Sequence, residues 1–245
     1  MATTMPETSA FQGEQRLGDI VLKFPGAAEI FKQHGIDFCC GGQRSLDAAA
    51  QEKGLVAATL LEELGASYNA LVGCKSDDVV DWSQVSLEQL IQHIVQTHHG
   101  YLKRMLPQLS EIAVKVLRVH GQLHGEVLSE VHRLFNSFRV EMESHLIKEE
   151  EIVFPEIIVY EQHPSSEKLQ QVIHDVKELD KEHDGAGNLL KELRQVTQDY
   201  ALPEDACATY TYLFQELERM ESDVFQHIHL ENNVLFERLV RQLKD

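Results

Sequence analysis

The sequence contains little cysteine, few aromatic residues and a deficit of positive charge. Only 4 of its 245 residues are cysteine, aromatic residues make up 7%, and 40 Asp and Glu residues outnumber 22 Lys and Arg residues, which gives a formal net charge of −18 at pH 7. Four cysteines, two of them adjacent, do not make the framework of a disulfide-rich secreted domain, so the sequence indicates a reducing cytoplasm. Because the negative charge repels phosphates, nucleic acid is not an expected partner.

Long apolar runs are also missing. No segment reaches the roughly 18 apolar residues of a membrane span, and the polar residues 1–10 lack the apolar core of a signal peptide. We therefore expect a cytoplasmic protein with no membrane partner. The 43% of hydrophobic residues is nevertheless enough for a packed core.

Helical periodicity dominates the chain, and no segment has the pattern of a strand. Residues 1–13 are interpreted as a flexible tail, 14–72 as a small helical N-terminal domain, and 73–84 as an acidic linker. The amphipathic segments of the small domain are expected at about 17–34, 45–53 and 57–70.

Residues 85–245 carry four long helical stretches joined by short turns. The stretches lie at about 86–117, 124–161, 166–197 and 204–243. The first two are separated by a predicted turn at His120-Gly121. Stretches of this length with short connections predict an all-α fold, an up-down-up-down four-helix bundle preceded by the small helical domain.

The unusual feature of this acidic chain is its 13 histidines, of which only His34 precedes Trp82. Within the bundle, a His-x-x-x-Glu pattern is repeated: His145 and Glu149 recur 82 residues later as His227 and Glu231, each time followed by aliphatic residues and phenylalanine. One such pattern is common on a solvated helix surface. Two copies with the same flanking residues instead indicate a functional site.

The four-residue spacing between each histidine and its glutamate indicates what kind of site the repeat forms. Residues i and i+4 lie on one helix face, so two such helices supply two imidazoles and two carboxylates to the bundle axis. His99 and His183 on the other two helices raise the imidazoles to four. A set of imidazoles and carboxylates without thiolate suits iron better than a structural zinc site, and carboxylates can bridge two ions, as they do in other bundle cores. Burying these groups without a metal would cost several kcal/mol.

The pattern alone leaves one ligand open. The centre of the apolar stripe in the first long helix points through His98, with His99 at its edge. The other histidines have no comparable partners, and no site role is expected for His93, His120, His124, His132, His163, His174 and His229.

Cys39 and Cys40 stand on a glycine-flanked turn of the small domain. Adjacent cysteines do not readily form an unstrained disulfide with each other, so we interpret the pair as thiol ligands or redox groups. The alternative is that both are small buried apolar residues. Cys74 and Cys207 are treated as structural or incidental.

Together these motifs resemble the iron–sulfur cluster repair di-iron proteins (the Repair of Iron Centres family, of the ScdA/YtfE type). The resemblance runs from about residue 14 to the end of the chain. It rests on Asp37-Phe-Cys-Cys-Gly-Gly42, on the two His-x-x-x-Glu segments, and on Glu182-His183-Asp184 in the third long helix.

The resemblance implies a hemerythrin-like bundle around a non-haem di-iron centre with an oxo or hydroxo bridge. Its implied ligands are bridging Glu149 and Glu231 and terminal His99, His145, His183 and His227. It selects His99 over His98, because the first long helix then aligns on both Trp82 and Pro107. Glu141 and Glu182 match carboxylates near the centre and are expected to line a channel. Oxygen-carrying hemerythrins have one more histidine, so open positions on the irons are expected here.

The function implied by the resemblance is repair of iron–sulfur clusters damaged by nitrosative and oxidative stress, through iron donation or reaction with nitric oxide. Cys39 and Cys40 would pass the iron on. The implied partners are damaged iron–sulfur proteins, nitric oxide or dioxygen, and a second copy in a homodimer. Two alternatives stay open: a binder or sensor of nitric oxide or dioxygen, and a nitric oxide reductase that forms nitrous oxide. The cysteine pair favours repair, because a gas binder has no need of it.

Overall fold

The computed structural model describes residues 10–72 and 80–243, without the side chains of 71–72, and the chain divides into two compact units, Met1–Val85 and Ser86–Asp245. The all-α prediction is confirmed: within the described ranges the chain forms helices and turns, and its only β pairing is an isolated bridge between Arg16 and Ser45. Most of the expected tail at 1–13 and of the expected linker at 73–84 lies outside the described residues.

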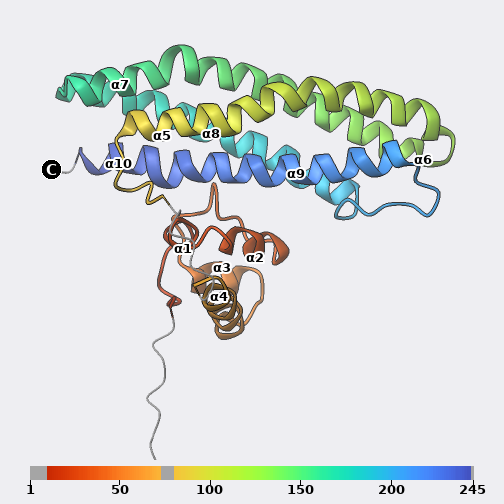
Figure 1. Cartoon of the computed structure of the whole chain (residues 1–245), viewed down its shortest axis with the longest axis horizontal. Helices are drawn as coiled ribbons and strands as arrows, with labels where there is room; N and C mark the ends of the chain where they lie inside the picture. The colour runs from red at the N-terminus through yellow and green to blue at the C-terminus, as the bar shows by residue number, and fades with distance from the viewer. Residues whose placement is uncertain (1–9, 73–79, 244–245) are drawn as a thin grey trace, which may run out of the picture. The chain divides into compact units, whose positions relative to one another are not determined.

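The first unit is a small cluster of short helices (Figure 1). They are α1 (Leu17–Lys23), α2 (Ala27–Gln33), α3 (Leu46–Glu52) and α4 (Ala57–Val72). Pro25 divides the expected segment 17–34 into α1 and α2, because proline disfavours helical geometry in the residue before it. The helices bury Leu17, Phe31 and Leu64 completely. Between α2 and α3 runs the turn that carries Cys39 and Cys40.

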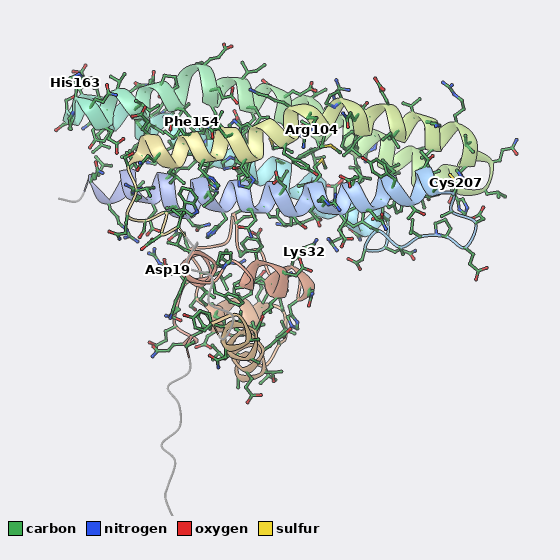
Figure 2. The ribbon with its side chains drawn as sticks, in the orientation of Figure 1. Asp19, Lys32, Arg104, Phe154, His163 and Cys207 are labelled. Carbon is green, nitrogen blue, oxygen red and sulfur yellow. The ribbon has the colours of Figure 1, made fainter. Side chains whose placement is uncertain are left out.

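The second unit is the predicted bundle of four rods, which lie side by side (Figure 1). Its elements, where η marks a π-helical turn, are α5 (Leu87–Ile94), η1 (Val95–His99), α6 (Gly100–Lys148), η2 (Glu149–Val153), α7 (Phe154–Gln162), α8 (Ser166–Val196), α9 (Ala208–Leu230), η3 (Glu231–Leu235) and α10 (Phe236–Arg241). The first rod runs from α5 into α6, and the second from α6 to α7. Helix α8 is the third rod, and α9 to α10 the fourth. His163 and Cys207 mark opposite ends of the bundle (Figure 2).

The predicted turn at His120-Gly121 is wrong in position. Helical hydrogen bonding continues through Gly121, and the chain reverses at His124, whose φ of −122° and ψ of 23° are not helical. A glycine inside a helix costs only about 1 kcal/mol, so Gly121 does not by itself end the rod. His124 is held in the turn by Asp205, whose Oδ1 lies 2.8 Å from its Nε2.

Capping interactions fix where the rods begin. Ser86 and Gln89 form a reciprocal capping box at the start of α5. The carboxylate of Glu161, at the end of the second rod, accepts hydrogen bonds from the backbone N–H groups of Leu87 and Glu88 at 2.7 and 3.0 Å. These bonds satisfy free donors of the first helical turn and tie the two antiparallel rods together.

The interior of the bundle is aliphatic along most of its length, with Leu90, Leu106, Leu190 and Leu217 completely buried. A belt of buried imidazoles and carboxylates interrupts this core. Its members are His99, His145, Glu149, His183, His227 and Glu231. None of the helices in the described part of the chain is both long and apolar enough to cross a membrane.

Candidate metal centre

The polar belt brings together all six residues that the resemblance implied as metal ligands. His145 is 4% exposed, and the other five side chains, His99, Glu149, His183, His227 and Glu231, are completely buried. Each of the four rods contributes at least one of them. Two imidazole–carboxylate pairs come from the rods that carry the His-x-x-x-Glu repeat.

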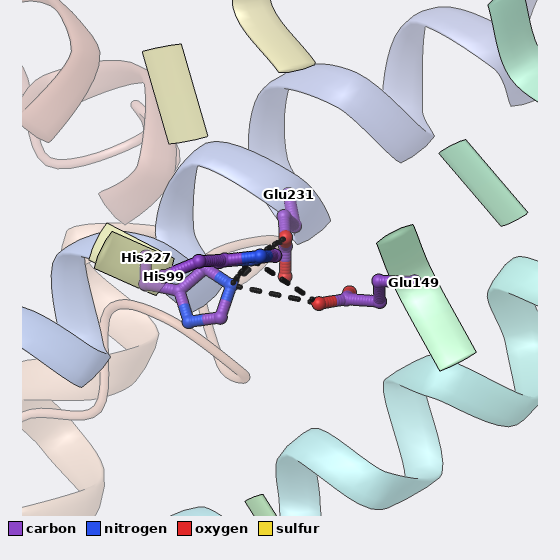
Figure 3. A group of neighbouring side chains, drawn as sticks. All are labelled: His99, Glu149, His227 and Glu231. Atoms are coloured by element: carbon purple, nitrogen blue, oxygen red, sulfur yellow. Dashed lines mark hydrogen bonds and ion pairs between the residues drawn. The ribbon is translucent and has the colours of Figure 1, made fainter. Parts of the chain in front are cut away.

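The six residues form two groups that share both carboxylates. His99 and His227 lie with Glu149 and Glu231 in the first group, and His145 and His183 lie with the same two glutamates in the second. Within each group, the four candidate ligand atoms are all within 4.8 Å of one another. Figure 3 shows the imidazoles of the first group directed toward the two carboxylates. Two neighbouring cations with common carboxylates fit this arrangement.

All four imidazoles present Nε2 to the interior of the belt. In the first group, His227 Nε2 is 2.9 Å from Glu231 Oε1, and His99 Nε2 is 3.4 Å from Glu149 Oε2. In the second, His183 Nε2 is 3.0 Å from Glu231 Oε2, and His145 Nε2 is 3.2 Å from Glu149 Oε1. The two Nε2 atoms within each group are 3.1 and 3.0 Å apart.

The outer nitrogens of three imidazoles are held by oxygen acceptors. His99 Nδ1 is 2.7 Å from Glu150 Oε1, and His145 Nδ1 is 2.8 Å from Glu182 Oε2. His183 Nδ1 is 2.8 Å from Asn232 Oδ1. An ionised carboxylate only accepts hydrogen bonds, so Nδ1 carries the proton. Partners of this kind orient metal-ligating histidines and fix their tautomer.

In the second group, the outer bonds of His145 and His183 leave the two Nε2 lone pairs facing each other. Two lone pairs about 3 Å apart repel each other unless a proton or a metal cation lies between them. Both oxygens of Glu149, Oε2 of Glu231 and Nδ1 of His227 are buried without a well-aligned hydrogen bond. Buried polar atoms without partners are rare in native proteins, and a cation would give the carboxylate oxygens their missing partner. The residues of the belt therefore fit a metal centre.

The electrostatics of the belt agree with its geometry. Burial raises the pKa of Glu149, and the negative charge of Glu231 raises it further. Burial also opposes the ionisation of Glu231, but His227 and the hydrogen bonds from neighbouring imidazoles hold its pKa well below its usual range. Burial likewise opposes protonation of His145, yet Glu149 and Glu182 raise its pKa to about 10. Protons and metal cations thus compete for one site.

Three π-helical turns lie at the ligands, and the sequence pattern did not reveal them. His99 ends η1, Glu149 begins η2 and Glu231 begins η3. Single π-helical turns inside α-helices are frequent at functional sites. A π-helical turn adds one residue to the helix. The next inward position after Ile94 is therefore His99, five positions further along the chain rather than four. An uninterrupted α-helix would instead carry the apolar stripe from Ile94 to His98.

His98 is buried beside the belt but takes no part in either group. Its Nδ1 lies 3.0 Å from Asp223 Oδ1, and its ring stacks on that of His227 at a centroid distance of 5.9 Å. The structure thus places His99, the residue that the resemblance selected, among the candidate ligands, while the apolar stripe alone pointed to His98.

Sequence reasoning placed Glu182 near the centre but missed the outer partners Glu150 and Asn232, although the repeat contained a signal for both. Glu150 follows Glu149 and holds His99, and Asn232 follows Glu231 and holds His183. The residue after each shared carboxylate therefore reaches the histidine of the neighbouring rod. The 82-residue repeat therefore includes these outer partners as well as the candidate ligands.

Glu141 and Glu182 line a cavity of about 530 Å³ between α6 and α8, and His145 is the one candidate ligand that reaches it. Glu182 also accepts a hydrogen bond from Lys148 at 2.8 Å. Both glutamates thus share the wall of one cavity with His145, a residue of the second group.

The cysteine pair lies in the first unit. Cys39 is buried and Cys40 is half-buried, and neither forms a disulfide. Cys207 is exposed at the start of α9, with its Sγ 3.2 Å from His120 Nε2. Cys74 lies outside the described residues.

Comparison with known proteins gives matches over nearly the whole chain. Residues 13–68 match ScdA_N, a domain of unknown function, and residues 90–239 match the hemerythrin HHE cation binding domain. The iron-sulfur cluster repair protein ScdA of Staphylococcus epidermidis is 34% identical over 92% of this chain and 98% of its own length. The chain belongs to the family of iron–sulfur cluster repair proteins. Other members include the YtfE protein of an Enterobacter species, 33% identical over 92% of this chain and 96% of its own length, and a probable repair protein of Haemophilus influenzae, 31% identical over 94% and 98%.

Membership in this family confirms the resemblance drawn from the motifs. The cysteine turn falls inside the ScdA_N match, and the whole polar belt falls inside the cation-binding match. The second unit is therefore a hemerythrin-like, metal-binding bundle.

Proposed function

We propose that the polar belt holds two iron ions and that the protein repairs damaged iron–sulfur clusters. The observation that carries this proposal is the division of six buried residues into two groups that share both carboxylates. His99 and His227 would bind one ion, His145 and His183 the other, and Glu149 and Glu231 both. Imidazole and carboxylate ligands without thiolate favour iron over a structural zinc ion.

The number of protein ligands favours a reactive metal centre over one that only stores a bound gas. Four imidazoles and two shared carboxylates do not fill the coordination positions of two octahedral ions, so positions remain for an incoming ligand. When it is loaded, the centre would supply iron, which can be donated to a damaged iron–sulfur cluster or can bind nitric oxide. The cavity at His145, with Glu141 and Glu182 on its wall, gives a small ligand or a departing cation a polar route between the belt and solvent.

The recipient is proposed to be a damaged iron–sulfur protein, because the relatives are named iron-sulfur cluster repair proteins. Cys39 and Cys40 would pass iron between the bundle and the recipient as thiolates. The free cysteines support a cytoplasmic location, since disulfides form in oxidising compartments. Nitric oxide or dioxygen is proposed as the small ligand of the centre.

The ligand set is tested with Glu149→Ala and His227→Ala. Both variants are expected to lose at least half of the iron bound per chain and to melt at a lower temperature, since metal binding contributes to folding free energy. His174→Ala, an exposed histidine on α8, serves as the control and should keep both properties. Full iron loading of Glu149→Ala and His227→Ala would show that the belt is not the iron site.

Repair is separated from gas binding by replacing Cys39 and Cys40 with serine. The double variant is expected to keep the iron of the belt and its nitric oxide adduct but to lose reactivation of a nitric oxide-damaged [4Fe–4S] protein. Undiminished reactivation would remove the main support for the repair role of the pair. Steady formation of nitrous oxide with an electron donor would instead support the reductase alternative.

A further inference from the structure

The turn that carries the cysteine pair in the first unit places the ligand atoms of three residues together. Cys39 Sγ lies 3.8 Å from Cys40 Sγ and 3.3 Å from Asp37 Oδ1. The ligand atoms of these three residues all lie within 4.8 Å of one another. Neighbouring side chains in an extended segment point to opposite faces, so this convergence is a property of the turn.

The backbone of the turn is held by hydrogen bonds from side chains and from the start of α1. Asp37 Oδ1 accepts from the N–H groups of Cys40 and Gly41 at 3.1 and 3.2 Å. Arg44 donates through Nη2 to the Asp37 carbonyl at 3.1 Å and through Nε to the Gly41 carbonyl at 3.2 Å. At the start of α1, the N–H of Gly18 donates to the Gly42 carbonyl at 2.9 Å.

Gly41 is required by this packing. A Cβ atom at position 41 would lie 2.6 Å from the Asp37 carbonyl oxygen and 2.3 Å from Arg44 Nη2. The distance to the Asp37 carbonyl oxygen excludes a side chain while the backbone stays in place, whereas the flexible Arg44 side chain could move. The glycine lets the turn close tightly enough to bring the two thiols to the same side.

The spacing matches one ion with two thiolate ligands. A metal–sulfur distance of about 2.3 Å in tetrahedral geometry puts two sulfur ligands about 3.8 Å apart. We propose that Asp37, Cys39 and Cys40 bind one thiophilic divalent cation, with both thiolates and one carboxylate oxygen as ligands, at a site separate from the belt. The proposed repair function is the basis for naming ferrous iron as its natural occupant.

The charges of the turn suit temporary binding. Two thiolates and one carboxylate overcompensate a divalent cation by one negative charge, and the Arg44 guanidinium lies beside them.

Three protein ligands leave one tetrahedral position open. Cys40 is only half-buried, so a donor atom of another molecule can approach the ion from its side. A thiolate of a recipient protein is the chemically matched donor, since thiolates hold iron in iron–sulfur clusters. The site is thus suited to carrying one ion from donor to recipient.

Cobalt(II) titration of the full, reduced chain under anaerobic conditions tests the site. Thiolate-to-cobalt charge transfer absorbs in the near ultraviolet, whereas imidazole and carboxylate ligands do not produce this band. We expect a band that saturates at about one equivalent, disappears in Cys39→Ser and in Cys40→Ser, and needs at least tenfold more cobalt in Asp37→Asn. Cys207→Ser, the control thiol, should keep it.

The test is independent of the bundle centre. His227→Ala is expected to keep the thiolate band, so loss of belt iron and loss of this site are separate outcomes. Hydrogen exchange of residues 36–45 checks that the turn in Asp37→Asn and in Cys40→Ser stays folded. A wild-type chain without the band, or a folded Asp37→Asn variant with unchanged affinity, would overturn the proposed three-ligand site.

Discussion

At the residue scale, the four candidate histidine ligands differ in how their outer nitrogens are held. Nδ1 of His99, His145 and His183 each faces an oxygen acceptor, whereas Nδ1 of His227 is buried without one. The ring of His227 is instead supported by stacking against His98. Outer partners raise the basicity of a histidine ligand, so the structure predicts that these partners contribute measurably to metal affinity.

Glu182→Gln tests this contribution. The amide retains the shape of the side chain but not its charge, so iron affinity is expected to fall by about 10- to 100-fold. Competition with a calibrated iron chelator measures the change. Glu178→Gln is the matched control, because Glu178 lines the same cavity but pairs with the exposed Lys181. Equal affinities in the two variants would contradict a role for Glu182 in holding His145.

Cys207 offers a prediction about pH. Its hydrogen bond with His120 and backbone N–H groups at the start of α9 lower the pKa of this exposed thiol to about 7. The thiolate is the reactive form, so its alkylation rate should rise as pH increases through about 7. His120→Ala should move that midpoint upward, toward the ordinary value of about 8.5.

Peptide-resolved mass spectrometry follows the alkylation of Cys207 separately from that of the other cysteines. A pH profile with the same midpoint in both proteins would show that His120 does not stabilise the thiolate.

At the element scale, α8 and α9 are joined by a buried ion pair. Glu221 is completely buried, and Arg194 donates to it through Nε, at 2.9 and 3.0 Å from its two oxygens, and through Nη2. Glu221→Ala removes the buried partner and leaves Arg194 with only the exposed carboxylate of Asp199 as a hydrogen-bonded acceptor. Such a loss typically costs about 3–5 kcal/mol.

Urea denaturation checks this expectation through the free energy of unfolding. Glu218→Ala is the control, since Glu218 is about half exposed and lies 3.8 Å from Arg194; exposed pairs contribute about 1 kcal/mol or less. A cost in Glu221→Ala no larger than in the control would mean that the pair adds little to the packing of α8 on α9.

The π-helical turns are the other decisive feature at this scale. Each adds one residue to a rod beside a candidate ligand, which rotates everything that follows by about 100° relative to an α-helix. Hydrophobic periodicity therefore predicts the rods correctly but not their register beyond the turn. This is why the apolar stripe pointed to His98.

At the scale of the whole molecule, iron bound in the belt is expected to stabilise the second unit and not the first. The belt lies in the unit Ser86–Asp245, while the first unit has its own core. Two ions, each present at about 100 times its dissociation constant, stabilise the bundle by about 5 kcal/mol. Chelation should therefore lower the melting temperature of the bundle by about 10–20 °C.

Hydrogen exchange separates the two units in this experiment. Removal of iron is expected to increase exchange at 95–99, 145–153 and 227–235, and to leave 17–33 unchanged. Calorimetry of the same samples gives the shift in melting temperature. Equal destabilisation of both units, or of neither, would contradict a metal centre confined to the bundle.

The sequence by itself determined the helices, the bundle and the residue types of the site, because 3.6-residue periodicity and i,i+4 spacing are local properties. It also indicated the pairing of His145 with Glu149 and of His227 with Glu231, since the same pattern occurs twice. The resemblance selected His99, but only the tertiary structure showed that a π-helical turn directs it into the belt, that Glu150 and Asn232 hold histidines of neighbouring rods, and that the chain reverses at His124. These outcomes depend on π-helical turns and on contacts between rods, and neither leaves a period in the sequence.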